Sequence, residues 1–75
     1  METIISILEN ILPGEDVAGC ETLVDDNILD SFAIITLVGD LEDEYGIIIS
    51  PSELVPENFN SAKALYEMVE RLRGE

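Results

Sequence analysis

The sequence predicts an all-α protein, a small bundle of three to four helices with a long loop between the first and second helices. Three segments carry apolar residues at the i, i+3, i+4 spacing of amphipathic helices. The chain has 75 residues, which is near the lower size limit for a domain held together by one apolar core. Residues 47–49 could form a short strand, but no second strand pattern exists to pair with it. We therefore expect residues 1–75 to form a single helical domain.

The first helix and the loop after it occupy the first 30 residues. The apolar positions of this helix are Ile4, Ile5, Leu8, Ile11 and Leu12. Pro13-Gly14 ends the helix, and the loop runs from about Pro13 to Asp30. Its apolar residues are Val17, Leu23, Val24, Ile28 and Leu29. A loop this long in a small domain usually has a function or anchors of its own, so we expect these residues to hold it in place.

The second helix is predicted from Ser31 to Tyr45, with Asp30 or Ser31 as the N-cap and Gly46 just past the end. Its core face comprises Ile34, Leu37, Val38, Leu41 and Tyr45. Phe32 and Ile35 fall on a different face, with Thr36, Gly39 and Asp43. Two interpretations of these two apolar residues remain open: they pack under the long loop, or they form a docking patch for a partner.

The rest of the chain predicts one short helix or turn and one long helix. Ser50-Pro51-Ser52-Glu53 has the pattern of a capping box, and Pro56 limits it to one or two turns. Pro56 to Phe59 can form another short turn. The last helix is predicted from Asn60 or Ser61 to Arg73. Its apolar face comprises Ala62, Leu65, Tyr66, Val69 and Leu72, so both Tyr45 and Tyr66 are expected in the core.

Composition excludes several classes of function. The net charge of −14, from 17 acidic and 3 basic residues, argues against nucleic-acid binding and favours partners with basic surfaces. With one cysteine and no histidine, the usual zinc and catalytic-cysteine sites are absent, and we expect no metal site. The chain starts without a basic signal-peptide region and has no apolar run of membrane-spanning length. We therefore expect a cytoplasmic protein that does not insert into membranes.

Acidic residues gather at the end of the second helix, at Asp40, Glu42, Asp43 and Glu44. Carboxylates in the last turns of a helix oppose its dipole, at typically about 0.3–1 kcal/mol each. A sequence selected for stability alone would place lysines there. One interpretation is a solvated helix face; the other is a surface that pairs with arginines and lysines of partner enzymes.

Ser31 is the residue with the most informative position, because it lies where the polar loop meets the second helix. No histidine or lysine near it in the sequence could act as its base, so it is a poor nucleophile by itself. The simplest explanation for a serine at a helix start is capping. The chain offers no pairing of a nucleophile with a base, so we expect no enzymatic activity.

The Asp30-Ser31-Phe32 triplet, which opens the second helix of a small acidic bundle, resembles the prosthetic-group site of acyl and peptidyl carrier proteins. The resemblance covers nearly the whole chain. It implies that a phosphopantetheinyl transferase, with coenzyme A and a divalent metal ion, esterifies Ser31 with 4′-phosphopantetheine. It also implies that Asp30 contacts the transferase or its metal, and that the positions of Phe32, Ile35 and Gly39 contact partners.

The resemblance implies a carrier that holds an acyl or aminoacyl cargo as a thioester and delivers it to other enzymes. The expected partners are the transferase, a cargo-loading ligase and acyl-transferring enzymes with basic surfaces, as in fatty acid biosynthesis and lipid metabolism, and we expect a monomer. Carriers of bacterial fatty-acid synthesis usually have glycine-alanine before the Asp-Ser pair and further acids early in the helix, where this chain has Ile28-Leu29 and Ala33, Ile34 and Thr36. The Leu-Asp-Ser-Phe form is more similar to D-alanyl, peptidyl or specialised acyl carriers. A long cargo could shelter against Leu37, Leu41, Ile49 or Phe59. The alternative function is an acidic protein-binding module or inhibitor without a prosthetic group.

Overall fold

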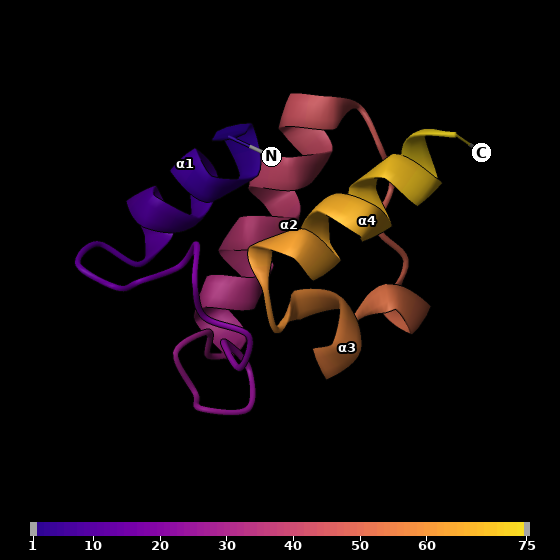
Figure 1. Cartoon of the computed structure of the whole chain (residues 1–75). Coiled ribbons are helices and arrows are strands. Elements are labelled where there is room, and N and C mark those ends of the chain that lie inside the picture. The colour runs from indigo at the N-terminus through magenta and orange to yellow at the C-terminus, as the bar shows by residue number, and fades with distance from the viewer. Residues whose placement is uncertain (1, 75) are drawn as a thin grey trace.

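The computed structural model describes residues 2–74, and within them the chain forms four helices, one 3₁₀ turn and no strand. The elements are α1 (Glu2–Ile11), α2 (Ser31–Tyr45), the 3₁₀ turn η1 (Pro51–Glu53), α3 (Pro56–Phe59) and α4 (Ala62–Arg73). The all-α prediction is confirmed, as is the long loop between the first two helices (Figure 1). None of these helices is long and apolar enough to cross a membrane.

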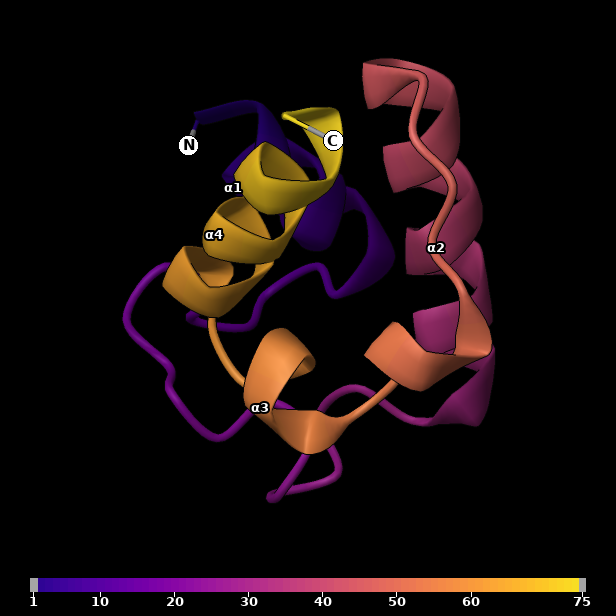
Figure 2. The same cartoon turned by 90° about the vertical axis from the view of Figure 1, so that its right-hand side faces the viewer.

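Helices α1, α2 and α4 pack against one another, and α3 packs against α4. After α2, the chain returns alongside this helix to η1, as Figure 2 shows. The core takes residues from every helix and from the loops. Its fully buried large side chains are Ile4, Leu8, Val17, Leu23, Leu29, Leu37, Leu41, Phe59, Leu65, Met68 and Val69. The predicted core faces of the first and second helices are therefore confirmed at their centres.

Helix α2, which carries the candidate serine, begins and ends with well-defined caps. Asp30 is the N-cap, and its Oδ1 accepts a hydrogen bond of 2.8 Å from the backbone N–H of Ala33. Gly46 adopts the left-handed conformation with φ of 64°, which glycine reaches without strain, and its N–H donates to the carbonyl of Glu42. Ser31 is thus the first helical residue and not the cap.

The long loop is anchored to the junction between α3 and α4 by one residue, Asn60. Its Oδ1 accepts from the backbone N–H groups of Val24 at 2.9 Å and Asp25 at 3.1 Å. Its own carbonyl accepts from the N–H of Leu23 at 2.9 Å. Beside these bonds, Leu23 and Leu29 are buried in the core. The prediction that the loop has anchors is confirmed, although its polar anchor was not foreseen.

The predicted capping box at residues 50–53 is wrong. The Ser50 hydroxyl makes no capping bond and lies 2.9 Å from the hydroxyl of Ser52. The Glu53 carboxylate is turned instead toward Arg71 of α4, with which it forms two hydrogen bonds of 2.6 and 2.9 Å. The tertiary contact with a guanidinium has thus replaced the local bond expected from the sequence.

The two tyrosines, both predicted to lie in the core, are less buried than expected. Tyr66 is 38% exposed, so its predicted core position is wrong; Met68 fills the core beside Leu65 and Val69 instead. Tyr45 is partly buried and packs against the core, with the Arg73 guanidinium carbon 5.6 Å from its ring centroid. On a helical wheel Tyr66 and Met68 lie at opposite edges of the apolar stripe, and the structure buries Met68.

The ion pair between Glu53 and Arg71 predicts a specific pH dependence of stability. Hydrogen bonds from Arg71 hold the pKa of the Glu53 carboxyl below its usual value. A carboxyl whose pKa is lower in the folded state stabilises the fold above its unfolded-state pKa, and this contribution is lost as the pH falls through the folded-state pKa. We expect the wild type to have a higher Tm than Glu53→Gln at pH 7, with the difference shrinking below about pH 4. Thermal unfolding of both proteins from pH 7 to pH 3 measures this, and a constant difference would contradict it.

Candidate functional site

Ser31 lies on the surface where the long loop enters α2, and its side chain is exposed. Among the described residues, no hydrogen bond involves its hydroxyl, so the oxygen is available to a partner. The carboxylate of Asp30 accepts a hydrogen bond from the N–H of Ala33. The N–H groups that precede Ala33 in α2 have no acceptor within the helix. The start of a 15-residue helix therefore suits the phosphate of a phosphodiester on Ser31.

The two large apolar residues of α2 that lie off its predicted core face are on the surface. Phe32 is 82% and Ile35 is 69% exposed, so the interpretation that they pack under the long loop is wrong. Gly39 follows on the same face, and a Cβ added there would meet no atom within 4 Å. Packing within the chain thus does not require glycine at this position, although glycine in a helix costs about 1 kcal/mol relative to alanine. This face thus presents two exposed apolar side chains close to Ser31.

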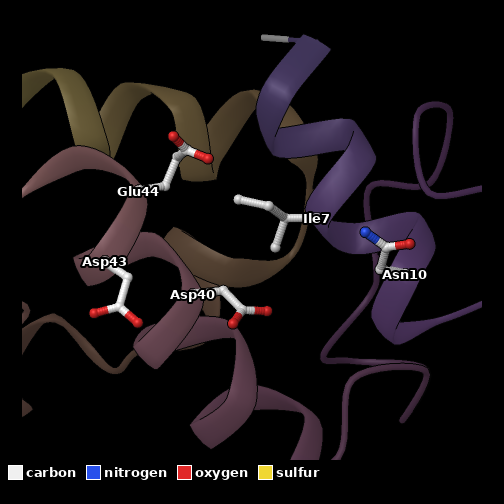
Figure 3. Close-up of a pocket in the computed structure, with 5 residues that line it drawn as sticks. All are labelled: Ile7, Asn10, Asp40, Asp43 and Glu44. Atoms are coloured by element: carbon white, nitrogen blue, oxygen red, sulfur yellow. The ribbon is translucent and has the colours of Figure 1, made fainter.

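The four acids near the end of α2 fall into two groups. Glu42 is half-buried, and its Oε2 accepts a hydrogen bond of 2.9 Å from the backbone N–H of Ile49, so it fastens the returning chain to the helix. Asp40, Asp43 and Glu44 are exposed. These three line a hollow of about 410 Å³ between α1 and α2, opposite Ile7 and Asn10 (Figure 3).

Two further hollows lie on either side of the start of α2. One, of about 460 Å³, is on the α1 side and is lined by Asn10, Ile11, Leu12, Ile28, Asp30, Phe32, Ala33, Thr36 and Asp40. The other, of about 180 Å³, lies between α2 and α3 and is lined by Val24, Ile34, Leu54, Val55, Pro56 and Phe59. Of the four residues expected to shelter a cargo, Phe59 lines this second hollow, while Leu37, Leu41 and Ile49 are buried in the core.

Comparison with known proteins assigns the chain to a family. The model of the phosphopantetheine attachment site family matches residues 2–69, which include the whole of α2 and the loop before it. The chain belongs to this family. It is thus a carrier domain of the acyl carrier protein family, whose cofactor is covalently attached 4′-phosphopantetheine and whose members are generally not catalytic. No curated protein and no solved structure matches the chain.

Sequence reasoning missed one wall of the acidic hollow between α1 and α2. Ile7 and Asn10 of α1 face the acids of α2, but Ile7 lay off the predicted apolar stripe and Asn10 is an ordinary exposed polar residue. The signal that could have indicated them is the i, i+3, i+4 spacing of Ile7, Asn10 and Ile11, which places the three on one side of α1.

Proposed function

We propose that this carrier domain holds an acyl or aminoacyl cargo on a 4′-phosphopantetheine arm attached to Ser31, and delivers it to partner enzymes in the cytoplasm. The observation that carries the proposal is an exposed serine hydroxyl at the start of α2, within the region matched by the family. The arm supplies a terminal thiol that binds the cargo as a thioester. A tether raises the local concentration of the cargo at each enzyme.

Asp30 is proposed to position Ser31 for the transferase. Its Oδ1 holds the N–H of Ala33 and so fixes the first turn of α2. The rest of its carboxylate faces solvent next to the serine, where the transferase or its divalent metal ion can reach it. Ser31 has no histidine in the chain to act as a base, so the transferase must accept its proton.

The docking surface for the transferase, the loading ligase and acyl-transferring enzymes is proposed to comprise two adjoining parts of α2. Phe32, Ile35 and Gly39 provide an apolar face against which a partner can pack closely. The exposed carboxylates of Asp40, Asp43 and Glu44 attract basic residues, and Glu42 contributes charge although it is fastened to Ile49. This surface suits a monomer that binds one enzyme at a time.

The attachment is tested by intact-protein mass spectrometry after incubation with coenzyme A, magnesium and a phosphopantetheinyl transferase of proven breadth. We expect the wild type to gain one phosphopantetheinyl group and Ser31→Ala to gain none. Ser52→Ala, which changes an exposed serine of η1, is the matched control and should be modified like the wild type. No gain of mass by the wild type would reject the carrier function and favour an acidic binding module.

The apolar docking face predicts that Ile35→Asp slows modification of Ser31. Ile35 is 69% exposed, so the change leaves the core intact, but it places a charge where a partner must exclude water. We expect kcat/KM of the transferase to fall by about tenfold or more, equivalent to about 1.4 kcal/mol of transition-state stabilisation. Ile48→Asp, at an isoleucine that is 83% exposed beyond the end of α2, is the control. Equal rates for both variants would remove Ile35 from the docking surface.

A further inference from the structure

Three side chains hold the stretch between η1 and α3 to helix α4. The Glu53 carboxylate accepts two hydrogen bonds from the Arg71 guanidinium, at 2.6 and 2.9 Å. The side-chain amide of Asn58 donates to the backbone carbonyl of Glu53 at 2.8 Å and to its Oε1 at 3.1 Å. Glu53, Asn58 and Arg71, which we call the Glu53 clamp, therefore join η1, α3 and α4.

The Glu53 clamp spans one wall of the hollow between α2 and α3. This wall comprises Leu54, Val55 and Pro56, which lie in the chain between the first two members of the clamp. Val24 of the long loop and Ile34 of α2 also line the hollow. Figures 1 and 2 both show α3 at the end of the bundle where α2 begins, so the hollow lies close to the start of α2.

The wall of the hollow is tied to α4 by side chains and not by its backbone. In the described part of the chain, the backbone hydrogen bonds of residues 53–58 are local and do not reach α4. Leu54 is 46% and Val55 is 38% exposed, so neither side chain is packed on all sides. The buried ring of Phe59 fixes the far end of the wall, and the Glu53 clamp fixes the near end.

The hollow between α2 and α3 has the size and the lining of a site for a short apolar group. Its volume is about 180 Å³, its six lining side chains are apolar, and it is the most enclosed of the three hollows. An apolar cavity of about 150 Å³ holds one benzene molecule, so this volume accommodates about six carbon atoms. A charged cargo would lose its hydration here without gaining a partner.

An arm on Ser31 is long enough to bring a cargo into this hollow. Ile34 lies three residues after Ser31, which is about 5 Å along the axis of α2. The arm contains about 14 consecutive bonds from the serine oxygen to its sulfur, and extends to roughly 16 Å at the rise per bond of an extended polypeptide. An arm that turns back toward Ile34 can therefore insert its cargo.

We propose that Glu53 determines the length of acyl cargo that this carrier shelters, because its clamp stops the wall of the hollow from moving outward. This inference rests on the proposed attachment at Ser31 and on an apolar acyl cargo. With the clamp intact, the hollow takes about six carbons of the chain, and the rest of a longer chain stays in solvent. Without the clamp, Leu54 and Val55 move away from Ile34 and the hollow takes a longer chain. Glu53 acts by positioning this wall, since it is not among the residues that line the hollow.

The test measures how the Tm changes when the arm carries acyl chains of increasing length. A promiscuous transferase loads the butanoyl, hexanoyl, octanoyl or decanoyl arm from the respective coenzyme A thioester. A cargo that lies in the hollow binds only the folded state and so raises the Tm. We expect the Tm of the wild type to rise by about 2 °C or more for each methylene added up to hexanoyl, and then to stay constant.

Glu53→Ala removes the clamp, and Glu70→Ala is its matched control. Both variants lose one carboxylate and one ion pair with an arginine of α4, but Glu70 pairs with Arg73 and does not belong to the clamp. Each loaded variant is compared with the same variant carrying the arm alone, so a general loss of stability cancels. We expect the Tm of Glu53→Ala to keep rising at octanoyl, and that of Glu70→Ala to stop rising at hexanoyl. Asn58→Ala, which removes the α3 side of the clamp, should behave like Glu53→Ala.

Methyl NMR of the hexanoyl form shows where the cargo lies. We expect the methyl signals of Ile34 and Val55 to shift relative to the form with the arm alone. The methyl signals of Ile11, which lines the hollow on the α1 side of α2, should stay in place. Shifts confined to Ile11, or no shift at any of the three residues, would reject the hollow between α2 and α3 as the site of the cargo.

Mass spectrometry of each sample separates this inference from the proposed function. A wild type that gains no arm rejects the attachment. A loaded wild type whose Tm is independent of chain length rejects the sheltering of the cargo and leaves the attachment intact. A wild-type Tm that keeps rising to decanoyl, or the same length limit in Glu53→Ala and Glu70→Ala, rejects the role of the Glu53 clamp.

Discussion

Phe59→Ala is expected to lower the free energy of unfolding by about 3–5 kcal/mol, the usual cost of truncating a buried aromatic residue. Phe59 is 1% exposed and is the only fully buried residue of α3, which has four residues. A domain of this size has a total stability of about 4–11 kcal/mol. The variant should therefore be partly unfolded near physiological temperature, as urea titration followed by circular dichroism would measure.

A variant of the same segment provides the control. Val55 precedes α3 and is 38% exposed, so Val55→Ala should change stability by about 0.5 kcal/mol or less. If Phe59→Ala cost less than about 1 kcal/mol, α3 would not be part of the cooperative core. Helix α3 would then be an appendage whose folding is independent of α1, α2 and α4.

Asn60→Ala is expected to have the next largest effect and to lower the free energy of unfolding by about 2 kcal/mol. The substitution leaves the N–H groups of Val24 and Asp25 without their acceptor. The loss should be concentrated in the long loop. Hydrogen exchange at residues 23–25 should accelerate by at least tenfold, while exchange at the centre of α2 should follow only the change in global stability.

Asn10→Ala is the matched control for Asn60, because Asn10 is exposed and no hydrogen bond of its side chain occurs among the described residues. It should leave both the stability and the exchange of the loop unchanged. Uniform acceleration of exchange by Asn60→Ala throughout the chain would show that the loop is not a separate unit, and would contradict its local anchoring.

The helices could be predicted from the sequence because their signals are local. Asp30 and Gly46 are typical residues for the two ends of a helix, and the predicted range of α2 agrees with the structure, although the sequence left Asp30 and Ser31 open as the N-cap.

The failures at Ser50 and Tyr66 have different causes. Arg71 of α4 captures the carboxylate of Glu53, and such a contact between distant segments leaves no trace in local spacing. Met68, by contrast, completes an i, i+3, i+4, i+7 pattern with Leu65, Val69 and Leu72, so local spacing indicated its burial.

The candidate site was foreseen in part. The position of Ser31 at the start of α2 followed from the pattern around it, and the exposure of Phe32 excludes its packing under the long loop, which a helical wheel leaves open. The hollow between α1 and α2 could not be predicted, because it depends on how close α1 lies to α2. Glu42 illustrates the same limit: only the path of the returning chain reveals that its carboxylate holds Ile49.

The anchoring of the loop by Asn60 has a consequence for biosynthesis. The loop that leads to Ser31 bonds to a residue 35 positions or more further along the chain. During translation, the loop therefore lacks this partner until residue 60 has been added, when more than three quarters of the 75 residues have been joined. The segment that leads into α2 can therefore reach its anchored conformation only after most of the chain has been synthesised.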